Sequence, residues 1–112
     1  MIFDQWDIIV VPFPFTDKGG DKRRPALVIS KRVFNENGHT LLAMITTRSH
    51  RPWPGDTRIA DPEATGLHLP CIVRMKAFTL DNRLIVKKIG HLSATDRKKV
   101  AERFRPYLSL RA

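Results

Sequence analysis

Short apolar segments, each followed by a turn, recur along most of this chain and constrain its fold more than any other feature. None of them approaches the roughly 20 apolar residues that a membrane helix requires. Glycine, asparagine, aspartate and proline at 16–21, 35–38 and 51–55 interrupt the chain as turn-forming residues do. The segments that predict strands are Trp6–Phe15, Pro25–Ser30, Thr40–Thr47, Cys71–Phe78 and Arg83–Ile89.

Prolines in the first predicted strand and a glycine after the last one indicate where these strands lie or end. Pro12 and Pro14 lack the backbone N–H that a central strand would donate, so we expect the first strand to lie at a sheet edge or to contain a bulge. Gly90 is expected to close the last strand.

One helix is predicted, at the end of the chain. Ser93 can cap its first turn, with Asp96 in the place of the usual glutamate of a capping box. Pro106 should end or kink the helix because it has no N–H to donate. The apolar residues that share one face of this helix are Leu92, Val100, Phe104 and Leu108. Several short strands followed by one helix predict a small β-barrel with a helix attached.

The length and the charge limit what kind of domain this is. The 112 residues, 42% of them hydrophobic, are expected to form one domain over residues 1–112. The formal net charge is +9, and residues 22–32, 48–58 and 83–112 carry net charges of +5, +2 and +7. This balance favours an anionic partner, with nucleic acid as the first candidate. For any one stretch, a solvated surface without a partner is an equally good explanation.

Cysteine and histidine exclude several kinds of site. The lone Cys71 cannot form an internal disulfide, suits a reducing compartment and is expected in the core. The histidines show no metal-ligand spacing, and no nucleotide-binding glycine motif is present, so the residues themselves indicate no metal or cofactor site. Met1–Asp7 carries no basic residue and does not resemble a secretory signal, so we expect a cytoplasmic protein without a membrane anchor.

Arg24 and two threonines are candidates for contact with a phosphate. Pro25 biases Arg24 toward an extended conformation. A guanidinium held in this way can grip a phosphate with two parallel hydrogen bonds, although an ordinary surface arginine is the alternative. Thr46 and Thr47 end the third segment, where their hydroxyls can donate to a phosphate oxygen or serve only as common strand residues.

Trp53 is a candidate for contact with a base. It lies near Arg48 and Arg51, where an exposed indole can stack on a base. The alternative use of this indole is to bury its loop against the barrel. His50 and His68 are expected in loops and are further candidates for contact with RNA.

Three segments together resemble the MazF/PemK family of type II toxin–antitoxin ribonucleases. They are WDIIVVPFPFTDKGGDKRRPALVIS at 6–30, LLAMITT at 41–47 and CIVRMKAFTLDNRLIVKKIGHLS at 71–93. They occur in this order, and the predicted helix follows them. The resemblance implies an SH3-like β-barrel with a C-terminal helix, a homodimer, and a cognate antitoxin that inhibits by laying a disordered segment across the RNA groove.

The resemblance also implies a chemistry, namely metal-independent, sequence-selective cleavage of single-stranded RNA. The RNA's own 2′-hydroxyl would attack the phosphate, leaving a 2′,3′-cyclic phosphate and a 5′-hydroxyl end. The family's arginine before the strand-entry proline falls on Arg24, and its threonine after the aliphatic run falls on Thr46. Arg24 would neutralise charge on the phosphate, and Thr46 would donate a hydrogen bond to it. The RNA-binding residues expected beside them are Lys22, Arg23, Thr47, Arg48, His50, Trp53, Arg74 and Lys76.

Two positions depart from the family pattern. Trp6 stands before Asp7, where glycine is usual. Some members carry an arginine in the fourth strand and an aspartate two residues later, whereas here Arg74 is followed by Lys76. The general base therefore has no assignment. The alternatives are a non-catalytic toxin of the same barrel type that binds gyrase, and a barrel that only binds nucleic acid.

Overall fold

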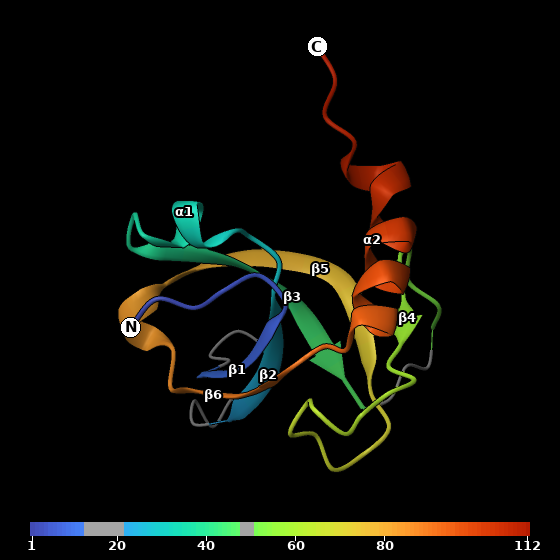
Figure 1. Cartoon of the computed structure of the whole chain (residues 1–112), viewed down its shortest axis with the longest axis horizontal. Helices are drawn as coiled ribbons and strands as arrows, with labels where there is room; N and C mark the ends of the chain where they lie inside the picture. Colours follow the sequence, from blue (N-terminus) through green and yellow to red (C-terminus); the bar gives the residue numbers. More distant parts are fainter. Residues whose placement is uncertain (13–21, 48–50) are drawn as a thin grey trace.

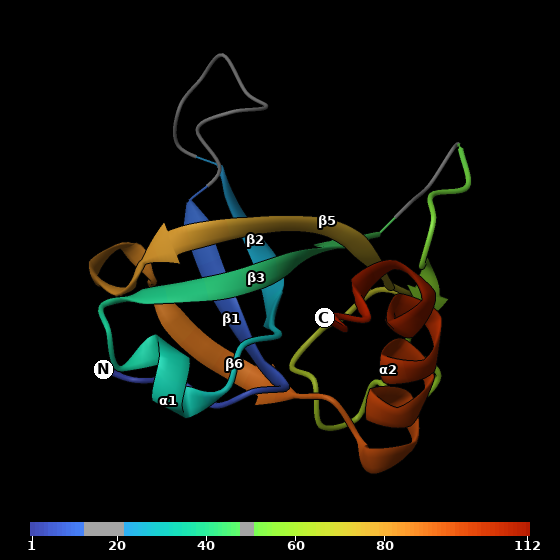
Figure 2. The same ribbon diagram turned by 90° about the horizontal axis from the view of Figure 1, so that it is seen from above.

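The strands form one antiparallel sheet that curls into a half-barrel. The computed structural model describes residues 1–12, 22–47 and 51–112, and its strand order is β4-β5-β3-β2-β1-β6. The strands are β1 (Asp7–Pro12), β2 (Arg23–Val28), β3 (His39–Thr46), β4 (Thr57–Arg58), β5 (Ile72–Asp81) and β6 (Lys87–His91). β5 arches over β1 and β2, and helix α2 (Ala94–Leu108) stands beside the sheet (Figure 1, Figure 2). This confirms the prediction of a mainly β barrel with a C-terminal helix.

Both faces of the sheet are buried, which explains the nearly continuous apolar runs in the sequence. Side chains alternate between the two faces along each strand. On one face, Val100 and Phe104 of α2 pack against Ile8, Leu27, Ala43, Ile45, Val73 and Leu92, with Cys71 buried among them as expected. The opposite face is covered by Phe3, Ile9, Val11, Ala26, Val28, Leu42 and Leu80.

The first strand lies inside the sheet, so the expectation of an edge position is wrong. β1 pairs with β2 on one side and with β6 on the other. Pro12 is tolerated because it is the last residue of β1, beyond the point where pairing with β6 ends. The alternative expectation, a bulge, is found between Ile8 and Ile9. Pro14 and the turn predicted at 16–21 lie outside the described residues.

The prediction for the last strand is wrong at both ends. The chain first forms the short 3₁₀ helix η1 (Asn82–Leu84), and β6 begins only at Lys87. Gly90 lies inside β6, where it pairs with Ile8. A Cβ at this position would lie 2.3 Å from the carbonyl oxygen of Ala64. Glycine here therefore permits a close approach of two segments and does not end the strand.

Helix α2 begins as predicted but continues through its proline. The Ser93 hydroxyl accepts a hydrogen bond from the backbone N–H of Asp96 (3.2 Å). Pro106 lies in the last turn, and the helix ends two residues later at Leu108. Phe104 is buried, whereas Leu108 is 47% exposed, so the predicted apolar face contacts the sheet only along its first turns.

Two short elements have no signal in the sequence. β4 has two residues, and helix α1 (Arg32–Asn35) has four, which is too few for a periodic pattern. The turn predicted at 35–38 begins inside α1 at Asn35, which is buried and donates to the carbonyl of Phe3 (2.8 Å). Within the described part of the chain, no helix has the length and apolar content needed to cross a membrane.

Candidate active site

β2 and β3 bring the two candidate catalytic residues together at one end of the sheet. Arg24 is half-buried and pairs with Val11 of β1. On its other side, Ala26 pairs with Met44, and continuing this register by two residues places Arg24 opposite Thr46. Thr46 is the last residue of β3 and is also half-buried. The pairing of β2 with β3 ends at Ala26 and Met44, so Arg24 and Thr46 lie two residues beyond the last pair, on one face and at one end of the sheet, where one phosphate can approach both side chains.

Because side chains alternate between the two faces of the sheet along β2, Arg24 and Arg23 lie on opposite faces. Val11, which pairs with Arg24, is buried on the face away from α2. Arg23 pairs with Pro12, is exposed and belongs to the other face. Among the described residues, no carboxylate pairs with the Arg24 guanidinium, which leaves its charge available to an anion.

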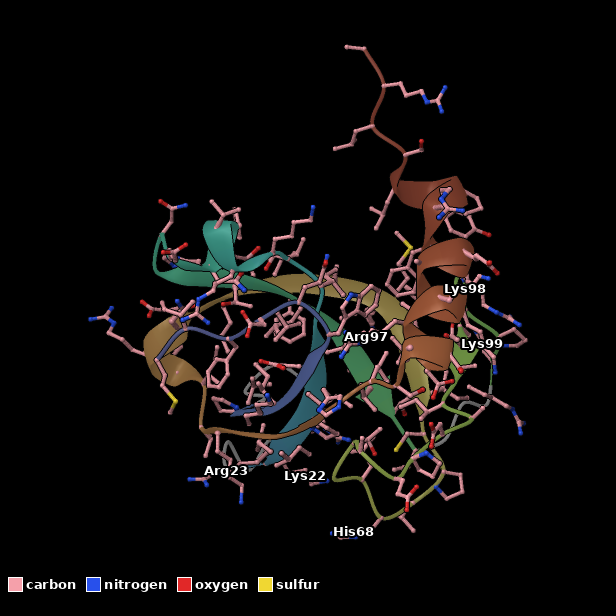
Figure 3. The ribbon with its side chains drawn as sticks, in the orientation of Figure 1. Lys22, Arg23, His68, Arg97, Lys98 and Lys99 are labelled. Atoms are coloured by element: carbon pink, nitrogen blue, oxygen red, sulfur yellow. The ribbon has the colours of Figure 1, made fainter. Side chains whose placement is uncertain are left out.

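The other predicted RNA-binding residues are spread over the ends of several elements. Lys22 and Arg23 are exposed at the start of β2 (Figure 3), and Thr47 is exposed just after β3. His68 is exposed in the loop between β4 and β5. Arg48 and His50 lie outside the described residues.

Arg74 has an acidic partner, but this partner comes from the preceding loop. Its Nε and Nη2 atoms donate to the two carboxylate oxygens of Asp56 at 3.0 and 2.9 Å, and Nη2 also donates to the carbonyl of Arg51 at 3.0 Å. The side chains of Arg74 and Asp56 are only 17% and 20% exposed. The hydrogen bonds to Asp56 raise the pKa of Arg74 above its ordinary value, against a smaller opposing effect of burial. This contact gives Arg74 a positioning role; its expected contact with RNA stays a prediction.

Trp53 covers a bulge in β5. Between Ala43 and Met44 of β3, the pairing skips Met75 and Lys76 of β5. The indole N–H of Trp53 donates to the carbonyl of Met75 (3.0 Å), and the Lys76 ammonium lies 5.2 Å from the centre of the ring. These contacts hold the loop against the sheet, as one of the two interpretations of Trp53 predicts, although residues 51–54 stay exposed. The indole is still 39% exposed, which leaves ring surface for a base.

Sequence reasoning missed Asp56, Arg58, Lys99 and Arg103, which surround the same end of β5. The bulge in β5 and the position of α2 bring them together, and neither feature leaves a local motif in the sequence. Among the described residues, no three His, Cys, Asp or Glu side chains are grouped as metal ligands would be.

Comparison with known proteins identifies the fold and the family. Residues 4–108 match the model of the family described as PemK-like, MazF-like toxin of type II toxin–antitoxin system. A search of curated proteins gave no significant match. Among solved structures, the Mycobacterium tuberculosis toxin MazF-mt6 is 21% identical, with a TM-score of 0.73 over 95% of this chain and 99% of that one. The MazE–MazF structure (Form-III) from Deinococcus radiodurans is 21% identical, with a TM-score of 0.75 over 99% and 100% of the two chains. An endoribonuclease in complex with its cognate antitoxin from a Mycobacterial species is 14% identical, with a TM-score of 0.74 over 98% of both chains.

Proposed function

Because the chain belongs to the family of PemK-like, MazF-like toxins of type II toxin–antitoxin systems, we propose that it is an endoribonuclease that cleaves single-stranded RNA. The observation that supports this proposal is the register of β2 and β3: continued two residues beyond its last pair, Ala26 and Met44, it brings Arg24 and Thr46 to the same face and the same end of the sheet. A guanidinium and a hydroxyl in these positions can form a two-sided cradle for one phosphate. A toxin that only binds gyrase has no need of such a cradle.

The cradle suits cleavage by transesterification. The RNA's 2′-oxygen attacks the adjacent phosphorus and loses its proton to a base, while the bond from phosphorus to the 5′-oxygen breaks. The products are a 2′,3′-cyclic phosphate and a 5′-hydroxyl end, so no water and no oxidant enter the step. Negative charge grows on the non-bridging oxygens, where the Arg24 fork neutralises it and the Thr46 hydroxyl donates a hydrogen bond.

Cleavage without added metal is the first test. Purified protein is incubated with single-stranded RNA in excess EDTA, and the new ends are mapped. We expect cyclic phosphate and 5′-hydroxyl ends. Cleavage that disappears in EDTA and returns with magnesium would contradict the proposed route, and binding without cleavage would favour a plain nucleic-acid-binding barrel.

The variant Arg24→Ala tests the site itself. Losing one preorganised donor at a developing oxyanion costs about a hundredfold or more in rate, so kcat and growth toxicity should be lost while the fold is kept. Arg24→Lys should also fail largely, because an ammonium cannot reproduce the two-pronged contact. The matched control is Arg23→Ala, on the opposite face of β2, which should raise KM but keep kcat at saturating RNA. If Arg23→Ala lost kcat while Arg24→Ala kept it, the catalytic arginine would be Arg23 and not Arg24.

Membership of this toxin family also suggests two protein partners, an antitoxin and a second copy of the chain. We propose that a cognate antitoxin binds across the RNA-binding face and that the toxin acts as a homodimer. A particle of 12.8 kDa in light scattering at micromolar concentration would contradict the dimer. Retained cleavage in the presence of a saturating antitoxin would contradict inhibition at this face.

A further inference from the structure

A second basic site lies where α2 meets the edge strand β4. This α2–β4 pocket has a volume of about 480 Å³ and is lined by Asp56, Thr57, Arg58, Ile72, Lys99 and Arg103. Lys99 extends from α2 on the side where β4 lies, whereas its neighbour Lys98 does not line the pocket (Figure 3). Two strands and one helix therefore contribute to one concave surface.

The net charge of this pocket is positive because Asp56, the one acid in its lining, already forms an ion pair with Arg74. Both carboxylate oxygens of Asp56 accept hydrogen bonds from Arg74. Arg103 uses one N–H to reach the backbone carbonyl of Asp56 (3.2 Å), which fixes its guanidinium at the rim and leaves its other donors for a ligand. Among the described residues, no carboxylate pairs with Arg58, which is exposed.

Lys99 has only a weak internal partner. Its ammonium lies 3.9 Å from the carboxylate of Asp96, at the outer limit of an ion pair. That carboxylate is buried and already accepts the backbone N–H groups of Ala60 and Asp61 at 3.1 and 2.9 Å. An anion in the pocket would therefore meet three cations that no internal acid fully neutralises.

One row of paired residues connects the rim of the pocket with the candidate active site. Arg58 pairs with Ile72, and Ile72 pairs with Thr46, so these residues lie in one row on the sheet face away from α2, and the pocket spans the edge strand β4 between this row and α2. Neighbouring strands are about 4.8 Å apart, which places the backbone of Arg58 about 10 Å from that of Thr46. An extended RNA strand with one phosphate at Arg24 and Thr46 can thus carry a nearby phosphate into the pocket.

We propose that the α2–β4 pocket binds a backbone phosphate of the RNA, one or two nucleotides from the phosphate that is cleaved. The proposal rests on the proposed ribonuclease function. Two arginines and a lysine suit a phosphate, whose oxygens accept several hydrogen bonds at once. The shared row with Thr46 favours RNA over an acidic peptide as the occupant.

The test compares two double variants that remove the same charge. Arg58→Gln with Lys99→Gln empties the pocket, and Lys87→Gln with Lys98→Gln is the matched control outside it. The probe is a fluorescent 2′-O-methyl RNA of random sequence, which lacks the attacking hydroxyl and so reports binding without cleavage. Affinity is measured by anisotropy between about 50 and 200 mM salt, the range over which phosphate contacts change affinity strongly.

We expect the pocket variant to bind about tenfold more weakly at the lowest salt, with the slope of log affinity against log salt reduced by about 0.7, the value for one phosphate of a single strand. The control should keep the wild-type slope, and both double variants should keep the wild-type melting temperature.

Equal slopes in the pocket variant and the control would overturn the proposal. So would a pocket variant that loses affinity for polyglutamate but not for RNA, since the occupant would then be an acidic protein segment. Failure of the wild-type protein to cleave RNA would count against the proposed function alone, because this assay does not depend on cleavage.

Discussion

Asp56→Asn is expected to loosen the loop at 51–56 from the sheet. The carboxylate of Asp56 accepts two hydrogen bonds from Arg74 and one from the backbone N–H of Trp53 (3.0 Å). Asparagine keeps the shape of the side chain but removes its charge and turns one oxygen into a donor. At least one of these three bonds is lost, and the Arg74 guanidinium stays partly buried without a counter-charge.

The size of the effect follows from the burial of this pair. A hydrogen bond to a charged group contributes about 1.5–3 kcal/mol net, and removing one partner of a buried pair leaves the other uncompensated. The two side chains are 17% and 20% exposed, so solvent screens the pair only in part. We expect the free energy of unfolding to fall by about 2–3 kcal/mol, or roughly 10 °C in melting temperature for a chain of this length.

The assay is urea unfolding followed by far-UV circular dichroism, with Asp81→Asn as the control. Asp81 accepts the same pair of hydrogen bonds, one on each carboxylate oxygen, from Nε and Nη2 of Arg83, whose side chain is 89% exposed. The chemical change is identical, but solvent screens the second pair, so the control should be clearly less destabilised. A double-mutant cycle with Arg74→Gln should then show coupling between Asp56 and Arg74.

Equal losses for Asp56→Asn and Asp81→Asn would refute the argument from burial. An unchanged unfolding curve together with faster amide exchange at 51–56 would show that the loop detaches locally, and the predicted global cost would then be wrong.

Three further predictions concern single residues. Trp6 has a φ of 80°, so Trp6→Gly should be more stable than Trp6→Ala by about 1 kcal/mol in urea unfolding, and the reverse order would contradict backbone strain at this position. Hydrogen bonds from Arg83 lower the pKa of Asp81 to about 2, below the roughly 3.9 of an unfolded chain, so its contribution to stability is present above pH 4 and lost as the pH falls toward 2. An NMR titration should show this value, and Arg83→Ala should raise it. Burial raises the pKa of the Cys71 thiol, so thiol reagents should label it slowly until urea is added, and rapid labelling of the native protein would show that this strand opens.

Much of the fold could be predicted because the strands are buried on both sides. β2 and β3 each contain an uninterrupted apolar run, at 25–28 and 41–45, and their ends lie within two residues of those predicted. The end of β6 differs from the prediction because Gly90 has the local pattern of a strand end, whereas the structure requires glycine there for a close approach to Ala64. Such a close approach depends on the packing of distant segments, which leaves no periodic pattern.

The candidate site also has one part that the sequence predicts and one part that it does not. Arg24 is predictable because Pro25 constrains it locally, whereas its placement at the same end of the sheet as Thr46 depends on the register of β2 and β3, which no local motif shows. The contact between Arg74 and Asp56 spans 18 residues and depends on a bulge. No spacing rule connects residues across such a gap, and the family pattern places the acid only two residues from Arg74, where this chain has Lys76.

The structure also shows which cations contribute to the basic character of the chain. The sequence alone weights every lysine and arginine equally, yet the acids of this fold are not spread evenly among them. Internal carboxylates partner Arg32, Arg74, Arg83 and Lys88. Arg24 and Arg58 have no such partner among the described residues, and the register places both on the row that runs through Thr46. Arg24 and Arg58 therefore contribute positive charge along that row because no described carboxylate forms an ion pair with them. Net charge counted by segment predicts an anionic partner, but it does not show which surface of the fold binds that partner.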